Sequence, residues 1–415
     1  MESEVIRKGK AAKTAARTLS KLSTAQKNKA LTAMADGLLA GQAKIIAANE
    51  LDIQAAKLHN MAEPMIDRLT LTADRIQAMA EGIRQVVALP DPVGQYLDTW
   101  DRPNGLHLEK ITVPLGVIAM IYESRPNVTV DAAALSVKSG NACILRGGSE
   151  AIESNKALVM VLRDALTKAG ITADAVNLIE NTDRALVQEL LTARQYVDLA
   201  IPRGGAGLIQ MVVNTATVPC IETGSGVCHV YVDKDADLDM AVRIIENAKV
   251  SRPSTCNAME TLLVHEDVLE SLLAKLVPVL TKDKVELRGD EAVRVAYQEL
   301  KAATDEDWST EYNALILSIK TVSSLQEALD HIRRFSTHHS ETIVTENVET
   351  ANAFLRDIDA AAVYVNASTR FTDGFEFGFG AEIGISTQKL HVRGPMGLTA
   401  LVTYKYVIHG NGQIR

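Results

Sequence analysis

The sequence has few cysteines, no long apolar run and no excess of positive charge, and each shortage excludes a class of protein. Its 415 residues contain four cysteines and no C-x-x-C pair, too few for a secreted disulfide framework. Cys228 and His229 are adjacent, but no second pair of closely spaced ligands accompanies them, so we expect no bound metal. The longest apolar run, residues 113–122, is interrupted by Pro114 and Gly116 and is too short to span a bilayer.

The overall composition is that of a folded, water-soluble protein. Hydrophobic residues make up 47% and charged residues 23% of the chain, close to the average for globular proteins. The formal net charge of −9 disfavours binding to nucleic acid or to an anionic membrane as the main function. The N-terminal residues lack the apolar segment of a secretory signal. We therefore expect a cytoplasmic protein of two to three domains.

The chain falls into three regions that differ in the spacing of apolar residues and in their content of proline. Residues up to about 87 show helical spacing of apolar residues, and the next stretch is rich in proline, with Asn104–Gly105 as the expected turn of a hairpin. From Gly116 onward short apolar runs alternate with helical patterns, which predicts parallel sheets covered by helices. We expect two such α/β lobes that meet near residues 222–226, a strand over 218–223, and a C-terminal strand that joins the hairpin.

Two glycine-rich turns follow predicted strands of the first lobe. Arg146 ends one strand and is followed by Gly147, Gly148 and Ser149, and the second turn contains Gly204 and Gly205. Ligands of parallel sheets gather at the carboxyl ends of strands, so these turns are candidate cradles for the phosphates of a dinucleotide. An ordinary tight turn between a strand and a helix explains the first of them equally well. The second lacks the third glycine of the dinucleotide fingerprint and is weak evidence by itself.

Cys256 differs from the other cysteines because it lies in a polar loop, SRPSTCNAME, between a predicted helix and a predicted strand. A nucleophilic thiol needs access and nearby positive charge, which Arg252 can supply. A bystander thiol is the alternative. Cys143, Cys220 and Cys228 lie in apolar runs, where we expect inert buried thiols.

Three polar residues near strand ends are further candidates. Glu222 lies between an apolar segment and a glycine turn, where it acts either as a general base or as an acceptor for loop amides. Arg125 can bind an anion and Asn127 can donate an amide hydrogen bond, although a turn with a helix cap explains the same residues.

Taken together, the motifs resemble those of the gamma-glutamyl phosphate reductase family within the aldehyde dehydrogenase superfamily. The resemblance covers nearly the whole chain. It is carried by six segments in family order: PLGVIAMIYESRPNVTVDAAALSVKSGNACILRGGSEAIESN, IPRGGAGLI, IETGSGVCHVYVD, SRPSTCNAMETLLVH, AAVYVNASTRFTDGFEFGFGAEIGIST and HVRGPMGL. Ser251 stands where the family usually has Gln, a departure that concerns local substrate contacts.

The resemblance implies an aldehyde dehydrogenase-like α/β fold with two parallel domains and an oligomerisation element. The implied ranges are 1–98 and 118–225 for an NADP-binding domain, 226–385 for a catalytic domain, and 99–117 with 396–415 for the oligomerisation hairpin and strand.

The resemblance also implies a role for each candidate residue. Cys256 matches the nucleophile, Asn127 the oxyanion-hole amide and Glu222 the glutamate before the glycine turn. Glu311 matches the glutamate that contacts the nicotinamide ribose. Arg125 or Arg252 is expected to hold the departing phosphate. Arg146, Gly147, Ser149, Gly204 and Gly205 are the expected cofactor-binding residues, with Arg146 pairing with a 2′-phosphate and so favouring NADP.

The implied reaction is the NADPH-dependent reduction of L-glutamyl 5-phosphate to glutamate 5-semialdehyde in proline biosynthesis, through a thioester on Cys256. A base that activates water would hydrolyse this thioester, so we expect Glu222 to shape its loop or to relay a proton from Cys256. The expected partners are the small-molecule substrate, further copies of the chain and, transiently, the glutamate 5-kinase that makes the labile acyl phosphate.

Three other functions remain open on the sequence alone. An oxidising aldehyde dehydrogenase would release a free acid without phosphate. A cysteine acyltransferase or hydrolase would use the thiol without a nicotinamide cofactor. A binding or assembly protein would keep the scaffold without catalysis.

Overall fold

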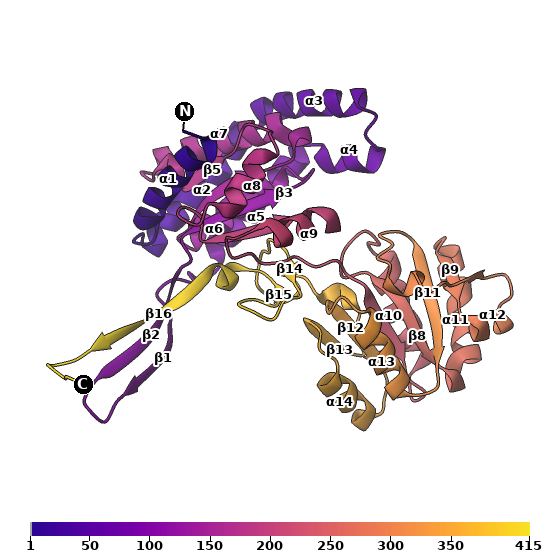
Figure 1. Cartoon of the computed structure of the whole chain (residues 1–415). Coiled ribbons are helices and arrows are strands. Elements are labelled where there is room, and N and C mark those ends of the chain that lie inside the picture. The colour runs from indigo at the N-terminus through magenta and orange to yellow at the C-terminus, as the bar shows by residue number, and fades with distance from the viewer. Residues whose placement is uncertain (1) are drawn as a thin grey trace. The chain divides into compact units, whose positions relative to one another are not determined.

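The computed structural model describes residues 2–415, except for the side chains of Pro64 and Ala206, and it divides into two compact units (Figure 1). Unit 1 runs to Thr223 and also contains Gly378–Gly384 and Met396–Arg415. Unit 2 contains Gly224–Phe377 and Ile385–Pro395.

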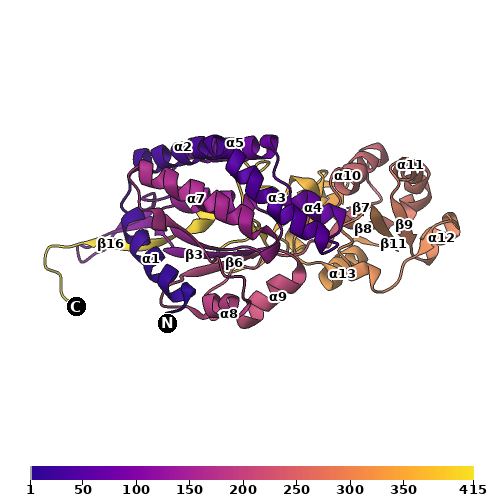
Figure 2. The same ribbon diagram turned by 90° about the horizontal axis from the view of Figure 1, so that it is seen from above.

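Unit 1 is built on a four-stranded parallel sheet in the order β5-β4-β3-β6. Its strands are β3 (Val117–Tyr122), β4 (Ala142–Arg146), β5 (Val176–Leu178) and β6 (Leu199–Arg203). Every residue of β3 and β4 is buried, as expected for a parallel sheet covered on both faces. Figure 2 shows α2, α5 and α7 on one side of this sheet, and α8 and α9 on the other.

Among the described residues of unit 1, nine α-helices accompany this sheet. They are α1 (Glu4–Leu19), α2 (Thr24–Ala40), α3 (Gln42–Leu58), α4 (Glu63–Leu69), α5 (Ala73–Ala88), α6 (Asn127–Lys138), α7 (Ile152–Lys168), α8 (Ala185–Thr192) and α9 (Ala206–Thr215). The first helices begin where the sequence provides caps: the Ser3 side chain accepts a hydrogen bond from the Ile6 amide, and Ser23 forms a capping box with Gln26.

A separate antiparallel sheet in unit 1 contains β1 (Tyr96–Asp101), β2 (His107–Pro114) and β16 (Val402–His409). The turn between β1 and β2 contains Asn104 and Gly105, and Gly105 has a φ of +86°, which favours glycine. The C-terminal strand that we expected beside the hairpin is β16, which pairs with β2.

Unit 2 is built on a seven-stranded parallel sheet in the order β10-β9-β11-β8-β7-β12-β13. Its strands are β7 (Cys228–Val232), β8 (Met259–His265), β9 (Glu286–Gly289), β10 (Lys301–Ala302), β11 (Ile316–Val322), β12 (Ser340–Val344) and β13 (Ala362–Val365). Its helices are α10 (Leu238–Val250), α11 (Leu269–Lys282), α12 (Glu291–Ala296), α13 (Leu325–Phe335) and α14 (Val348–Asp357), and a short ladder joins β14 (Ile385–Ser386) to β15 (Gly394–Pro395).

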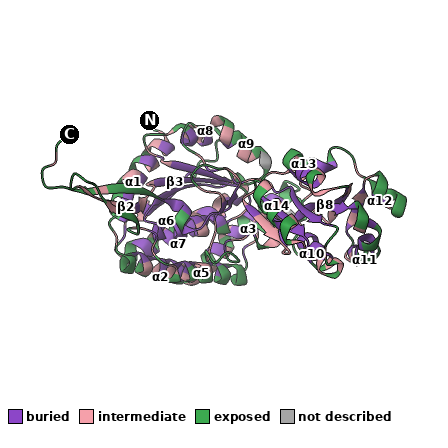
Figure 3. Ribbon diagram, turned by 90° about the horizontal axis from the view of Figure 1, so that it is seen from below, coloured by how far each residue is buried: buried purple, intermediate pink, exposed green. Residues whose placement is uncertain are grey.

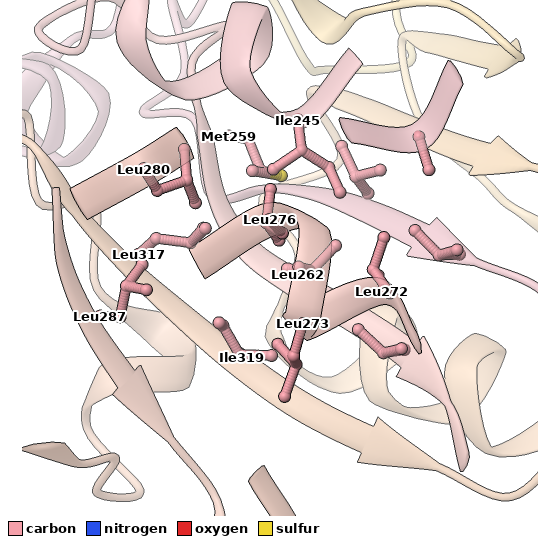
Figure 4. Packing of buried hydrophobic residues seen from close by; sticks show 14 of the residues in the cluster. Ile245, Met259, Leu262, Leu272, Leu273, Leu276, Leu280, Leu287, Leu317 and Ile319 are labelled. Atoms are coloured by element: carbon pink, nitrogen blue, oxygen red, sulfur yellow. The ribbon is translucent and has the colours of Figure 1, made fainter. Parts of the chain in front are cut away.

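The core of unit 2 fixes the strand that follows Cys256. Leu262 of β8 packs in one apolar cluster with Ile245 of α10 and with Leu272 and Leu276 of α11 (Figure 4). All seven residues of β8 are buried, and Figure 3 colours this strand accordingly. Burial of several large aliphatic side chains contributes about 1.5–3 kcal/mol each, so the start of β8 is held firmly.

The structure differs from the sequence expectations in two places. No continuous strand forms over residues 218–223, where one was expected; instead Cys220 forms an isolated bridge with Ala200, and Thr223 is a separate bridge residue. Strands β9 and β10 and helix α12 were not anticipated. Across residues 2–415, no helix is both long enough and apolar enough to cross a membrane.

Candidate active site

Cys256 lies in the loop Ser251–Ala258, called the thiol loop below, between α10 and β8. The loop is a series of turns in which the Thr255 amide donates to the Arg252 carbonyl at 3.3 Å and the Ala258 amide donates to the Thr255 carbonyl at 2.9 Å. Cys256 itself is half-buried. The predicted position of this cysteine, in a loop between a helix and a strand, is confirmed.

The thiol loop lies at the amino edge of the sheet of unit 2. Because the strands are parallel, the segments that enter β7, β8 and β11 share this edge. Gly226 precedes β7 and Glu311 precedes β11, and the Gly226 amide donates to Glu311 Oε1 at 2.8 Å. A β-carbon on Gly226 would fall 1.4 Å from the Cys256 carbonyl oxygen. The fold thus brings Glu311 to the segment that packs against the thiol loop.

A second thiol supports the loop from inside the sheet. Cys228 is fully buried, and its Sγ donates to the Cys256 carbonyl oxygen at 3.2 Å. Burial raises the pKa of Cys228 well above its usual value, and burial raises that of Cys143 to about 12. Both thiols are therefore poor nucleophiles, as expected. Cys220 was expected to be buried but is only half-buried, and burial and then the Glu222 charge raise its pKa.

Asn257 fixes the position of Cys256 from the neighbouring residue. Its side-chain nitrogen donates to the carbonyl oxygens of Thr372 at 2.9 Å and Arg370 at 3.2 Å. Its side-chain oxygen accepts from the Thr255 hydroxyl at 2.9 Å and from the Arg370 guanidinium. Arg370 was not among the residues expected from the sequence, because 113 residues separate it from Asn257 and only the fold brings the two together.

Arg146, at the carboxyl end of β4 in unit 1, is buried, with 6% of its surface exposed. Its guanidinium donates to the carbonyl oxygens of Gly147 and Thr182, the latter at 2.9 Å, and its buried Nε has no hydrogen-bond partner among the described residues. Burial lowers its pKa. The Nε–H group of Arg146 therefore lacks a hydrogen-bond acceptor among the described residues at this strand end.

The expected cradles of unit 1 hold carboxylates of the chain itself. The Gly205 amide donates to Glu123 Oε2 at 3.0 Å. Near the other turn, the Ser124 amide and hydroxyl both donate to Glu150 Oε1 at 2.7 Å. These amide and hydroxyl donors are therefore occupied by anionic oxygens of the chain itself.

The remaining candidates of this strand edge differ in their exposure to solvent. Gly147 is buried, Ser149 is exposed at the start of a short 3-10 helix, Gly204 is exposed after β6, and Arg125 is half-buried after β3. A β-carbon on Gly204 would fall 2.5 Å from a Glu123 carboxylate oxygen, so the turn is closely packed.

Asn127 and Glu222 belong to unit 1, whereas Cys256 and Arg252 belong to unit 2. Asn127 is the first residue of α6, is exposed, and donates to Asp131 Oδ2 at 3.2 Å. Burial raises the pKa of Asp131 to about 6. Glu222 is exposed just before the end of the first stretch of unit 1, and Arg252 is exposed in the thiol loop. Among residues 2–415, no group of three or more His, Cys, Asp or Glu residues is arranged to hold a metal ion.

Comparisons with known proteins show the family and the fold of the chain. A model of the aldehyde dehydrogenase family matches residues 1–305. A gamma-glutamyl phosphate reductase from Moorella thermoacetica is 58% identical over 412 residues, 99% of each chain, and one from Heliobacterium modesticaldum is 57% identical over 413 residues, 100% of this chain and 99% of that protein. The crystal structure of gamma-glutamyl phosphate reductase from Thermotoga maritima matches with a TM-score of 0.98 at 49% identity, over 100% of both chains. The predicted fold class is confirmed.

Proposed function

Because the chain belongs to the gamma-glutamyl phosphate reductase family, within the aldehyde dehydrogenase family, we propose that it reduces L-glutamyl 5-phosphate to L-glutamate 5-semialdehyde with NADPH and releases phosphate. This reaction is the second step of proline biosynthesis. The observation that carries the proposal is the half-buried Cys256 in its ordered loop, in a chain 58% identical to a reductase of that name.

The thiolate of Cys256 attacks the carbonyl carbon of the acyl phosphate. A carbon–sulfur bond forms, the bond from the carbonyl carbon to the phosphate oxygen breaks, and phosphate leaves with the electron pair. NADPH, when bound, supplies the hydride that takes the thioester to the oxidation level of an aldehyde. Release of the aldehyde returns the thiolate. A thioester is a better hydride acceptor than a free carboxylate, which explains the need for the thiol.

An oxyanion develops on the carbonyl oxygen during acyl transfer, and amide donors stabilise it. The Cys256 backbone N–H and the Asn127 side chain are the proposed donors, each lowering the barrier by about 3 kcal/mol when aligned. The hydrogen bonds of Asn257 support this role of Cys256, because they hold the peptide next to the thiol. Asn127 keeps one amide hydrogen for the oxyanion while Asp131 accepts the other.

Glu222 is proposed to shape its loop or relay a proton from Cys256, and not to activate water. Water activation would hydrolyse the thioester and waste the phosphorylated substrate. Arg252 and Arg125 are the proposed partners of the departing phosphate.

The cofactor is proposed to bind at the carboxyl edge of the sheet of unit 1. Arg146, with its unsatisfied Nε, and the Gly205 amide provide donors for phosphate oxygens. Gly147, Ser149 and Gly204 complete the proposed set there. Glu311 is proposed to accept a ribose hydroxyl, and its bond to the Gly226 amide fixes its carboxylate for that role.

Three expectations about the surroundings of the enzyme stay proposals. They are a cytoplasmic location, assembly of several copies through the sheet β1-β2-β16, and a transient encounter with the kinase that makes the acyl phosphate.

The test is the reverse reaction, followed as NADPH formed from cyclised glutamate semialdehyde with and without inorganic phosphate. We expect NADPH only when phosphate is present, and a loss of more than about 1,000-fold in Cys256→Ala. Cys220→Ala, at another half-buried cysteine, is the matched control and should retain activity. NADPH formation without phosphate would indicate hydrolysis to the free acid, and full activity of Cys256→Ala would refute the thioester route.

A further inference from the structure

The guanidinium of Arg370 lies across the thiol loop. Arg370 is in the short 3-10 helix Thr369–Phe371, which follows β13. Its Nε donates to Ser251 Oγ at 3.1 Å and its Nη1 donates to the Asn257 side-chain oxygen. Ser251 is the first residue of the loop and Asn257 directly follows Cys256, so one planar cation spans the segment that carries the thiol.

The charge of Arg370 has no carboxylate within ion-pair distance among the described residues. The charge of Arg252, next to Ser251 in the thiol loop, repels that of Arg370, and the charge of Asp373, three residues further along the chain, attracts it. Burial, and then the charge of Arg252, lower the pKa of Arg370. By contrast, Arg288 in the same unit pairs with both Glu286 and Asp307. A partly buried cation beside a second cation is unfavourable in the free protein and becomes favourable when an anion binds between them.

Arg370 also has donors to spare. A guanidinium carries five N–H groups, and the two bonds above use one on Nε and one on Nη1. The second Nη1 hydrogen and both Nη2 hydrogens have no hydrogen-bond partner among the described residues. A planar fork of this kind matches two oxygens of a phosphoryl group, with better orientation than a lysine provides. The Asn257 side chain that accepts one of these hydrogen bonds belongs to the residue directly after Cys256, so the spare donors lie on the segment that carries the thiol.

We propose that Arg370, together with Arg252, binds the phosphoryl group of the acyl phosphate beside Cys256, and that Arg370 fixes the orientation of this group. The inference rests on the proposed function, since that function supplies the phosphoryl group. Two cations beside the thiol draw in the anionic end of the substrate and stabilise the phosphate as it leaves. The same residues bind inorganic phosphate in the reverse reaction.

The first test compares two alkylating reagents that differ in charge. Iodoacetate carries a carboxylate and iodoacetamide is neutral, and the rate of modification of Cys256 by each is measured by mass spectrometry. In Arg370→Gln we expect the ratio of the iodoacetate rate to the iodoacetamide rate to fall about tenfold, and inorganic phosphate to protect Cys256 less than in the parent. Arg356→Gln, which removes an exposed arginine paired with Asp357 on α14, should leave the ratio unchanged.

An equal fall in both alkylation rates would overturn the proposal, because it would mean that Arg370 only orders the loop. Arg370→Lys provides a second check, since it keeps the charge and loses the fork. We expect this variant to retain part of the preference for iodoacetate.

The second test measures KM in the reverse reaction. In Arg370→Gln we expect the KM for phosphate to rise about tenfold while the KM for the semialdehyde stays within twofold. A rise in the semialdehyde KM alone would assign the cluster to the carboxylate of the amino acid and refute the proposal. Failure of the proposed function is recognised separately, as a parent enzyme that forms no NADPH with phosphate, and the alkylation ratio still tests the anion site in that case.

Discussion

The Cα of Gly226 lies against the Cys256 carbonyl group, so closely that a β-carbon on Gly226 would be 1.4 Å from the oxygen and 2.4 Å from the carbon. The neighbour is backbone and not a flexible side chain, so it has little room to move. We expect Gly226→Ala to displace the thiol loop and to lower kcat by more than about 100-fold.

The matched control is Gly82→Ala in α5, where a β-carbon would meet nothing within 4 Å. This change should leave activity unaltered and raise the free energy of unfolding by about 0.5–1 kcal/mol, since alanine favours helix. Full activity of Gly226→Ala would show that the close approach does not position Cys256.

Lys249 and Glu260 form a fully buried ion pair behind the thiol loop, and Lys249 also donates to the Met259 carbonyl at 2.9 Å. Lys249→Met leaves the Glu260 carboxylate buried without its cation, and we expect unfolding to become easier by about 3–5 kcal/mol at neutral pH. Burial already raises the pKa of Glu260 to about 7, against the charge of Lys249. In Lys249→Met, Glu260 holds a proton in the folded chain at pH values where the unfolded chain has lost it. The free energy of unfolding of this variant should therefore fall as pH rises.

Urea titrations of Lys249→Met at two pH values measure this cost. Adding Glu260→Gln to Lys249→Met removes the unpaired charge and should recover part of the loss. Simple additivity of the two single variants would contradict coupling between the pair.

His331 is buried among His229, Trp308 and Phe335, and its Nε2 has no hydrogen-bond partner among the described residues. Burial lowers its pKa to about 3, helped by nearby positive charge. Between pH 6.5 and pH 3, His331 therefore binds a proton in the unfolded chain but not in the folded chain. The free energy of unfolding falls as the solution is acidified through that range. The loss should reach about 2 kcal/mol by pH 5.

In His331→Leu this part of the acid sensitivity should disappear, which urea unfolding at pH 7.5 and pH 5 measures. His59→Gln, at an exposed histidine after α3, should keep the parent's slope. An unchanged slope in His331→Leu would assign the acid sensitivity to other groups.

Arg146 is the proposed partner of the 2′-phosphate of NADP. In Arg146→Ala we expect the ratio of kcat/KM for NADPH to that for NADH to fall about tenfold, because only NADPH loses a charge-assisted contact. The ratio is informative because disorder of the turn would harm both cofactors equally. Arg163→Ala, at an arginine of α7 that pairs with Asp174, is the control in the same unit. Equal losses with both cofactors would refute the assignment.

The sequence predicted the structure correctly where the spacing of apolar residues and the local motifs point to the same element. Alternation of short apolar runs with helical periodicity predicted the parallel sheets, and the polar loop around Cys256 distinguished this thiol from Cys143 and Cys228, which are buried. Asn104–Gly105 predicted the turn of the hairpin because a turn of this kind needs a residue that tolerates positive φ.

What the sequence did not predict depends on long-range contacts. Arg370 reaches Ser251 and Asn257 only through the fold, and although it lies in one of the segments that carry the family resemblance, no local pattern distinguishes it from its neighbours. Because ligands of parallel sheets gather at the carboxyl ends of strands, the sequence directed attention to unit 1. It did not predict that Cys256, Glu311 and Gly226 lie together at the amino edge of the sheet of unit 2. β9 and β10 have four and two residues, too few to show a periodic pattern.

The discontinuity of unit 1 has a consequence for biosynthesis on the ribosome. All seven strands of the large sheet of unit 2 have been translated once the ribosome has added Val365. Strand β2 of unit 1, by contrast, cannot pair with β16 until His409, the last residue of β16, has been added. The large sheet of unit 2 can thus form before unit 1 is complete. The hairpin of β1 and β2 is synthesised early but lacks β16, the third strand of its sheet, until the end of translation. A nascent chain stalled before β16 would therefore expose an unpaired strand edge, to which chaperones or other nascent copies can bind.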